Sequence, residues 1–217
     1  ERSGRQMAII LDTDVIIPHE TAQRNTIQLK VVQVENPRAF RLEDRSQLRF
    51  NGPRLVTRTL LGARTGRPEV AVDVYSSRGE FSLLNAVTAH WNMGRIIENW
   101  SANFGLTRTT LTRNSTVMHL SEKAHETNDA LNAWTLPSGT IVTSREGGPD
   151  LAFTSLDILA HEFTHLVNFH SAGIRVGQRG PGGVLEHVCD AHATILERRL
   201  ESERDLFSSD FRARGRG

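Results

Sequence analysis

Two histidines and a glutamate within five residues have the types and the spacing of a zinc hydrolase site. His161 and His165 are four residues apart in the segment His-Glu-Phe-Thr-His. On a helix, residues at positions i and i+4 project from one face, so both imidazoles can bind one metal ion. Glu162 follows the first histidine, and its carboxylate can reach a water bound to that metal. The segment therefore predicts a metal-dependent hydrolase, with zinc as the ion that these ligand types favour.

A second segment with helical spacing offers a third ligand. Glu186 and Asp190 are again four residues apart, in Gly-Gly-Val-Leu-Glu-His-Val-Cys-Asp, and Glu186 lies twenty-one residues after His165. This separation leaves room for one loop between two helices, so Glu186 is the candidate third ligand. Three protein ligands leave one position open for water, as in catalytic zinc sites. Zinc lowers the pKa of such a water to roughly 7, and Glu162 would accept its proton and pass it to the leaving amine.

Chance explains this combination poorly. A chain with this content of His and Glu contains His-Glu-x-x-His by accident in roughly one case in forty, and the downstream Glu-x-x-x-Asp lowers this about tenfold. The segment 155–160 leads into the first pattern with apolar residues, and Leu166-Val167 leads out of it. A helix with one side to bury is therefore expected. The competing interpretation is a solvated helix with two chance histidines.

Cys189 and His90 are further candidates for metal binding, and each has a structural alternative. Cys189 is the only cysteine, so no intrachain disulfide can form and the redox compartment stays open. It follows Glu186 by three residues, which turns it only partly toward the same side, and a buried small apolar residue is the favoured interpretation. His90 lies in the apolar stripe of an expected helix, where a hydrogen-bonded core histidine is favoured over a ligand.

The bulk properties restrict the class of protein. The chain has 217 residues and a formal net charge of +1, enough for one sizeable domain or two small ones and unsuited to nucleic acid or an anionic membrane as main partner. No apolar run reaches the length of a membrane span. The first residues of the sequence do not resemble a signal peptide. We therefore expect that any targeting segment has been removed or never existed. The oligomeric state stays open.

The expected elements change from strands to helices along the chain. The first strand is expected to be interrupted at Asp12-Thr13-Asp14 and stopped by Pro18, and residues 38–50 read as irregular. We expect a β-rich region over 1–75, a second domain over 76–206 and a flexible basic tail over 207–217. Strands are predicted over 7–17, 27–34, 54–61, 70–75, 115–120 and 139–143, and helices over 81–100, 154–170 and 183–203.

Residues 81–205 resemble the thermolysin family of zinc metallopeptidases. The resemblance is strongest in Asp-x3-His-Glu-x2-His, which begins at Asp157, and in Gly-x2-Glu-x3-Asp, which begins at Gly183. It implies an α+β, zincin-like fold: a β-rich N-terminal layer, a long helix, a sheet with an edge strand and two zinc-binding helices. It also implies zinc ligands at His161, His165 and Glu186, a catalytic base at Glu162, and Asp190 as the carboxylate that orients His161.

The resemblance further implies a calcium site near the zinc helices. Asp157, Glu197 and Asp205 fall where the family places calcium-binding carboxylates, and hard oxygen donors suit that ion. Simple surface carboxylates, or for Asp157 a place in the first turn of its helix, are the alternative.

Several positions depart from the family pattern. The C-terminal helical domain, with the histidine that steadies the oxyanion, lies beyond what this chain contains, and no tyrosine occurs in 172–176. Leu185 replaces an asparagine, so the contact that would orient His165 is expected to be absent. The substrate-edge Asn-Ala-aromatic pattern is expected, in weakened form, at residues 128–131. Arg175 and His187 are candidates for stabilising the oxyanion, with ordinary surface roles as the alternative.

These observations favour a zinc-dependent endopeptidase acting on peptide or protein substrates. We expect it to be secreted by a bacterium or delivered into a host or competitor cell. Two other hypotheses stay open: a non-catalytic module that keeps zinc for stability and binds a partner, and a zinc hydrolase of a non-peptide amide. The intact Glu162 argues against the first of these, because a structural zinc site needs no general base.

Overall fold

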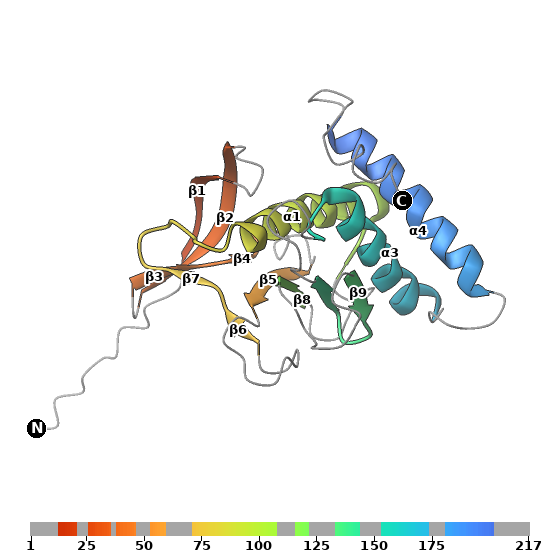
Figure 1. The fold of residues 1–217 in the computed structure, drawn as a ribbon, viewed down its shortest axis with the longest axis horizontal. Coiled ribbons are helices and arrows are strands. Elements are labelled where there is room, and N and C mark those ends of the chain that lie inside the picture. Colours follow the sequence, from red (N-terminus) through yellow and green to blue (C-terminus); the bar gives the residue numbers. More distant parts are fainter. Residues whose placement is uncertain are drawn as a thin grey trace, which may run out of the picture.

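Two β-sheets and three long helices make up the described fold. The computed structural model describes residues 13–20, 26–35, 38–46, 53–59, 71–107, 116–121, 133–143, 153–173 and 181–201. One sheet lies at the N-terminal end of the molecule, helices α3 and α4 lie side by side at the other end, and α1 extends between them (Figure 1). This α+β arrangement confirms the expected fold class. None of the described helices is long and apolar enough to cross a membrane.

The first sheet is antiparallel, with the strand order β1-β2-β3-β7. Its strands are β1 (Thr13–Glu20), β2 (Thr26–Glu35), β3 (Arg38–Arg41) and β7 (Tyr75–Ser76). Alternation along β2 buries Ile27, Leu29 and Val31 on one face, as the sequence predicts, and they pack in one cluster with Phe81 and Val87. The sheet is thereby attached to α1.

Strand β1 corrects the prediction of a break at residues 12–14 and a stop at Pro18. The strand begins at Thr13 and continues through Pro18, which faces Gln28 in the register. Because β1 is the edge strand in this order, a proline there can present its missing N–H away from the neighbouring strand. Residues 7–12 lie outside the described part of the chain.

The second sheet has six strands, and it carries the elements that face the helices. Its order is β4-β5-β8-β10-β9, and β6 pairs with β5. Pairs β5–β8 and β8–β10 are parallel, whereas β9 pairs antiparallel with β10 and forms the edge. The strands are β4 (Glu43–Asp44), β5 (Arg54–Thr59), β6 (Val72–Asp73), β8 (Thr116–Ser121), β9 (Ala133–Leu136) and β10 (Thr140–Thr143).

Two sequence predictions concern these sheets. Strand β3 of the first sheet and strand β4 of the second lie within residues 38–50, so the prediction of an irregular segment there is wrong for 38–41 and 43–44. The division into two domains at residue 75 stays a prediction; the six-stranded sheet takes strands from both sides of that residue.

Helix α1 (Leu84–Phe104) joins both sheets through His90. The His90 ring is buried, with Nδ1 2.8 Å from Thr57 Oγ1 on β5 and Nε2 3.0 Å from the Lys30 carbonyl oxygen on β2. The interpretation of His90 as a hydrogen-bonded core histidine is confirmed. The helix ends at Gly105, whose φ of +62° is left-handed and favours glycine.

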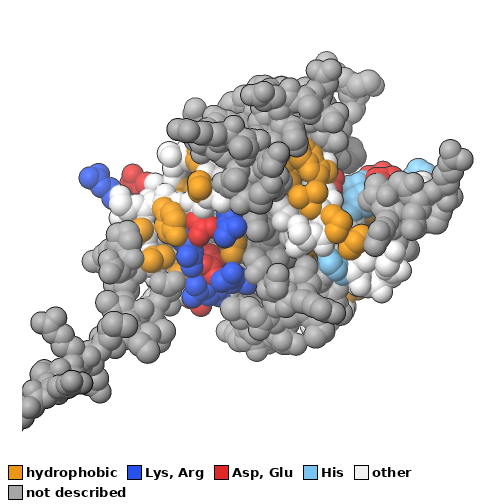
Figure 2. All heavy atoms as spheres, turned by 90° about the horizontal axis from the view of Figure 1, so that it is seen from below, with side chains coloured by type: hydrophobic (Ala, Val, Ile, Leu, Met, Phe, Trp, Pro, Cys, Tyr) orange, Lys and Arg blue, Asp and Glu red, His pale blue; other side chains and the backbone are white. Residues whose placement is uncertain are grey.

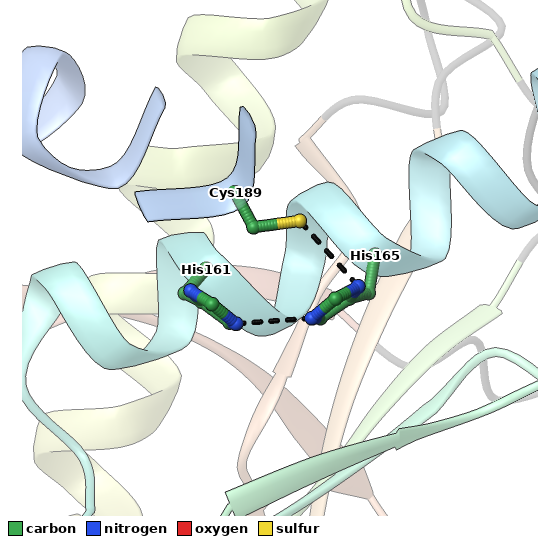
Figure 3. A group of neighbouring side chains, drawn as sticks. All are labelled: His161, His165 and Cys189. Atoms are coloured by element: carbon green, nitrogen blue, oxygen red, sulfur yellow. Dashed lines mark hydrogen bonds between the residues drawn. The ribbon is translucent and has the colours of Figure 1, made fainter. Parts of the chain in front are cut away.

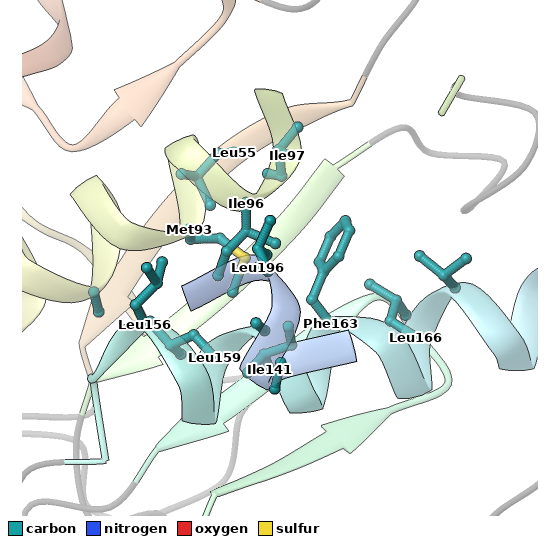
Figure 4. Packing of buried hydrophobic residues seen from close by; sticks show 14 of the residues in the cluster. Leu55, Met93, Ile96, Ile97, Ile141, Leu156, Leu159, Phe163, Leu166 and Leu196 are labelled. Atoms are coloured by element: carbon teal, nitrogen blue, oxygen red, sulfur yellow. The ribbon is translucent and has the colours of Figure 1, made fainter. Parts of the chain in front are cut away.

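Helices α3 (Leu156–Ala172) and α4 (Pro181–Glu201) share a core with α1 and the second sheet. Figure 4 shows side chains from all of these elements converging, with Phe163 of α3 among Met93, Ile96 and Leu196. Each fully buried aromatic or aliphatic side chain contributes about 1.5–3 kcal/mol relative to exposure. This packing fixes the two helices that carry the predicted metal ligands.

An ion-pair network stabilises the junction of the two sheets. The buried Glu43 carboxylate is paired with Arg41, with Arg45 at 2.6 Å and with Arg54 at 3.2 Å. Burial opposes ionisation of Glu43, but the hydrogen bond from Arg45 and the neighbouring positive charges outweigh it, and the pKa of Glu43 is lowered. Figure 2 shows a face of the molecule on which Lys and Arg side chains gather around Asp and Glu side chains.

Candidate zinc-peptidase site

Helix α3 presents both histidines because its opposite side is buried. Leu159, Phe163 and Leu166 are buried in the core, and His161 and His165 lie one helical turn apart on a different face. The helix starts after Ser155, which has extended backbone angles, and stops at Gly173 with φ +65°. The buried side keeps α3 from rotating, and the two imidazole rings lie 4.7 Å apart between their centroids.

Helix α4 brings Glu186 to the two histidines. Its inner face is formed by Leu185, Cys189, Ala193 and Leu196, which are all buried. Because these apolar residues fix the rotation of α4 against α3, the intervening Glu186 carboxylate is directed toward the imidazoles. Glu186 Oε2 lies 3.2 Å from His161 Nε2 and 3.4 Å from His165 Nε2.

The three atoms are arranged as ligands of one ion. His161 Nε2 and His165 Nε2 are 2.9 Å apart, which closes a triangle with Glu186 Oε2. A circle through the three atoms has a radius of about 1.8 Å, slightly less than the roughly 2.0–2.1 Å that zinc keeps to such ligands, so all three atoms could bind one ion. Two imidazole nitrogens and one carboxylate oxygen are also the donor set that suits zinc. The residues therefore fit the ion.

Asp190 holds the other nitrogen of His161. Asp190 Oδ1 lies 2.8 Å from His161 Nδ1. A carboxylate only accepts hydrogen bonds, so Nδ1 carries the proton and Nε2 is left with a free lone pair for a metal. This is the contact that the resemblance implies.

Cys189 contacts His165 on the side away from the other ligands. Its fully buried sulfur is 3.4 Å from His165 Nδ1, and Figure 3 shows it reaching over α3 from α4. Ligand-type atoms of Cys189, His161 and His165 lie within 4.8 Å of one another. The sulfur nevertheless touches Nδ1, so one ion cannot bind both this sulfur and the Nε2 pair. Leu185 has no polar atom in its side chain to contact His165, and the sulfur of Cys189 lies against Nδ1 of that ring instead.

The thiol of Cys189 is neutral in this setting. Burial, followed by the negative charges of Glu186, Glu162 and Asp190, raises its pKa to about 12. Burial likewise lowers the pKa of His165. A neutral imidazole facing a neutral thiol agrees with Nδ1–H donating to the sulfur.

Glu162 is held by Thr135 of the edge strand β9. Thr135 Oγ1 lies 2.9 Å from Glu162 Oε2 and 2.7 Å from the Glu162 carbonyl oxygen. Burial is the main cause that raises the pKa of Glu162; the hydrogen bond from Thr135 and the charge of His161 oppose it, and the charge of Glu186 adds to it. A buried carboxylate with a raised pKa is suited to general base catalysis.

Sequence reasoning missed both β9 and Thr135. The signal was present: Asn132-Ala133-Trp134 is a complete Asn-Ala-aromatic pattern, and Ala133 and Trp134 begin β9. The weak version expected at residues 128–131 was therefore placed four residues too early, in a segment outside the described residues. The strand itself is only four residues long, which gives little alternation to recognise.

A cavity of about 470 Å³ lies beside these groups. Ala133 of β9, His161 and Glu162 of α3, and Asp190 of α4 are among its lining residues. The apolar Phe153 and Ile158 line it as well. The cavity joins the candidate catalytic groups to the end of the edge strand.

The remaining predicted residues are placed as follows. Asp157 and Glu197 are buried and line the same cavity, while Asp205 lies outside the described residues. Asp157 Oδ1 accepts from the Ile158 backbone N–H at 2.8 Å and from Ser155 Oγ at 2.5 Å, as an acid in a first helical turn does. His187 is exposed on α4, and Arg175 lies outside the described residues.

The model of the thermolysin metallopeptidase catalytic domain matches residues 19–168. The chain therefore belongs to the thermolysin metallopeptidase family, which is zinc-dependent. The match ends within α3, so the assignment of α4 as the source of Glu186 and Asp190 depends on the geometry described above.

A solved structure agrees in fold. The precursor of protealysin, a metalloproteinase from Serratia proteamaculans, superposes with a TM-score of 0.51 at 17% identity. The match covers 68% of this chain and 44% of that chain, so this chain spans less than half of the precursor's length. Among curated proteins, none matches the sequence.

Proposed function

We propose that this chain carries the zinc site of a metalloendopeptidase and hydrolyses peptide bonds. The observation that carries the proposal is the triangle of His161 Nε2, His165 Nε2 and Glu186 Oε2, with sides of 2.9, 3.2 and 3.4 Å. Membership of the thermolysin metallopeptidase family supports it independently.

His161, His165 and Glu186 would hold the ion, and Asp190 would keep His161 in the tautomer that binds metal. Zinc, when bound, supplies a Lewis acid that polarises the substrate carbonyl and makes water a nucleophile at neutral pH. Glu186 is about half exposed, so the Glu186 corner of the ligand triangle is accessible from solvent.

Glu162 would move the proton. Its carboxylate would take a proton from the attacking water and then donate that proton to the leaving amine of the peptide bond. Thr135 keeps the Oε2 atom of this carboxylate beside β9, and burial keeps its pKa above the ordinary value so that it can both accept and return a proton.

Strand β9 would bind the substrate as an added strand. One edge of β9 pairs with β10, and within the described part of the chain no strand pairs with the other edge. An extended peptide can satisfy such an edge with main-chain hydrogen bonds, independent of side-chain identity. Ala133 on β9 lines the cavity that also contains Glu162, which supports a peptide path from the strand to the catalytic base.

The residues that stabilise the oxyanion, the calcium ligands and the place of action are also proposed. Arg175 or His187 is proposed as an oxyanion donor if no other segment provides one. Asp157, Glu197 and Asp205 are proposed as calcium ligands; the two described members line one cavity. Thermolysin-like proteases are typically secreted, and we propose action outside the producing cytoplasm.

A Glu162→Gln exchange tests the proposal. Zinc-loaded wild-type protein is expected to cleave denatured casein, to lose this activity with a chelator and to regain it with zinc. The Glu162→Gln variant should retain zinc and lose at least a hundredfold in rate. Glu80→Gln, an exposed carboxylate outside the site, is the matched control and should keep full activity.

The other outcomes separate the alternatives. Cleavage that persists in Glu162→Gln contradicts the assignment of the base. A zinc-loaded wild type that cleaves neither casein nor a peptide library contradicts the proposed activity and favours a zinc-stabilised binding module. Activity restricted to non-peptide amides favours the third hypothesis.

A further inference from the structure

We propose that Cys189 is a positioning residue. Its sulfur accepts a hydrogen bond from the Nδ1–H group of His165 and so fixes that ring for metal binding. This inference rests on the proposed zinc site. It assigns a function to a side chain that the sequence identifies only as a buried apolar residue.

The geometry around His165 supports this role of Cys189. Its side chain is buried, so water does not readily satisfy the nitrogen that faces away from the metal, and an unpaired buried N–H costs about 1–3 kcal/mol. Cys189 Sγ lies 3.4 Å from that nitrogen, a normal length for a hydrogen bond to sulfur. Nε2 of the same ring lies 2.9 Å from His161 Nε2 and 3.4 Å from Glu186 Oε2.

The two histidines each have a neighbour on α4 at the same ring nitrogen. The adjacent residues Cys189 and Asp190 on α4 each contact the Nδ1 atom of a different histidine on α3. If each Nδ1 carries the proton, each Nε2 carries none, and both rings have the tautomer required for binding one ion. A single turn of α4 thereby provides Glu186 as a ligand and the partners that orient the other two ligands.

The two contacts differ in strength. Asp190 offers a charged oxygen at 2.8 Å, whereas Cys189 offers a neutral sulfur at 3.4 Å, and sulfur is the weaker acceptor. The full burial of Cys189 compensates in part, because its position is fixed by core packing and no water competes for the imidazole N–H.

Four variants separate the hydrogen bond from simple packing. Cys189→Ala and Cys189→Val both remove the acceptor, and only the first also removes volume. Cys189→Ser keeps an acceptor at nearly the same place. Leu196→Val, on the buried face of the same helix, is the matched control for a small packing change without contact to the histidines.

The readout is the zinc dissociation constant of the purified proteins, measured by competition with a chromophoric chelator at pH 7. Removal of such an orienting contact typically weakens metal binding by about ten- to a hundredfold. We expect at least tenfold for Cys189→Ala and Cys189→Val, and less than about threefold for Cys189→Ser and Leu196→Val. The visible spectrum of the cobalt-substituted protein should change in the first two variants only.

The inference is overturned if Cys189→Ala and Cys189→Val bind zinc as tightly as the wild type, or if Cys189→Ser weakens binding as much as they do. If the apolar variants fail to fold, ¹⁵N spectra of wild type and Cys189→Ser decide: the His165 Nδ1–H signal should be protected from exchange and shift in the variant, and an unshifted signal overturns the inference. A wild type that binds no zinc instead overturns the proposed function.

Discussion

The buried imidazole of His90 is expected to make the fold sensitive to acid. A carbonyl oxygen only accepts, so Nε2 donates to the Lys30 carbonyl and Nδ1 accepts from the Thr57 hydroxyl. A second proton, on Nδ1, would force the Thr57 hydroxyl to accept and not donate, and it would place a charge in the core. Burial therefore lowers the pKa of His90 to about 4, although the charges of Asp44 and Glu43 act in the opposite direction.

The size and sign of the effect follow from this shift. In the unfolded chain the histidine titrates near its ordinary 6.5, so between pH 6.5 and 4 the unfolded state binds more protons than the folded one. The stabilisation is fully present above pH 6.5 and is lost as the pH falls toward 4. The shift corresponds to about 3 kcal/mol in total and to a loss of about 2 kcal/mol at pH 5.

The loss of stability due to His90 is measured by urea unfolding of the zinc-free wild type and of the His90→Gln variant at pH 7 and pH 5. Glutamine keeps an N–H donor for the Lys30 carbonyl but does not titrate. A metal chelator removes zinc from both proteins, so the histidines of the zinc site affect the unfolding free energy of both equally. Wild type is expected to lose about 2 kcal/mol more than the variant between the two pH values. Equal losses would refute the assignment of a neutral, buried His90.

Three further exchanges test the site and its core. Asp190→Ala should weaken zinc binding about ten- to a hundredfold in chelator competition, because His161 loses its orienting acceptor; an unchanged affinity contradicts this. Thr135→Val removes a hydrogen bond that stabilises ionised Glu162, so the acidic limb of kcat/KM should move up by at most about one pH unit, and a downward shift contradicts it. Phe163→Ala should lower the free energy of unfolding in urea by about 3–5 kcal/mol, and a loss below about 1 kcal/mol contradicts its core role.

The parts of the site that are local in sequence could be predicted. The i and i+4 spacing places His161 beside His165 and Glu186 beside Asp190 on any regular helix. The apolar residues between them fix which side of each helix is buried. Helices α3 and α4 therefore follow from the pattern alone, and so does the face on which the candidate ligands lie.

The parts of the site that depend on contacts between distant segments could not be predicted from the sequence. Whether Cys189 reaches His165 depends on the rotation of α4 against α3, and spacing from Glu186 alone does not determine it. Thr135 meets Glu162 only because β9 is the edge of a sheet assembled from separate segments of the chain. The short strands β3 and β4 lie in a charged segment in which Glu43 is surrounded by arginines rather than by apolar neighbours.

A crystal structure of the zinc-loaded protein, with anomalous data at the zinc edge, tests the central claim most directly. We expect one ion about 2.0–2.2 Å from His161 Nε2, His165 Nε2 and a Glu186 oxygen, with a fourth position free of protein ligands. Cys189 should remain outside the coordination sphere, with its sulfur on His165 Nδ1. An ion bound by the Cys189 sulfur, or one that leaves Glu186 unligated, would contradict the account.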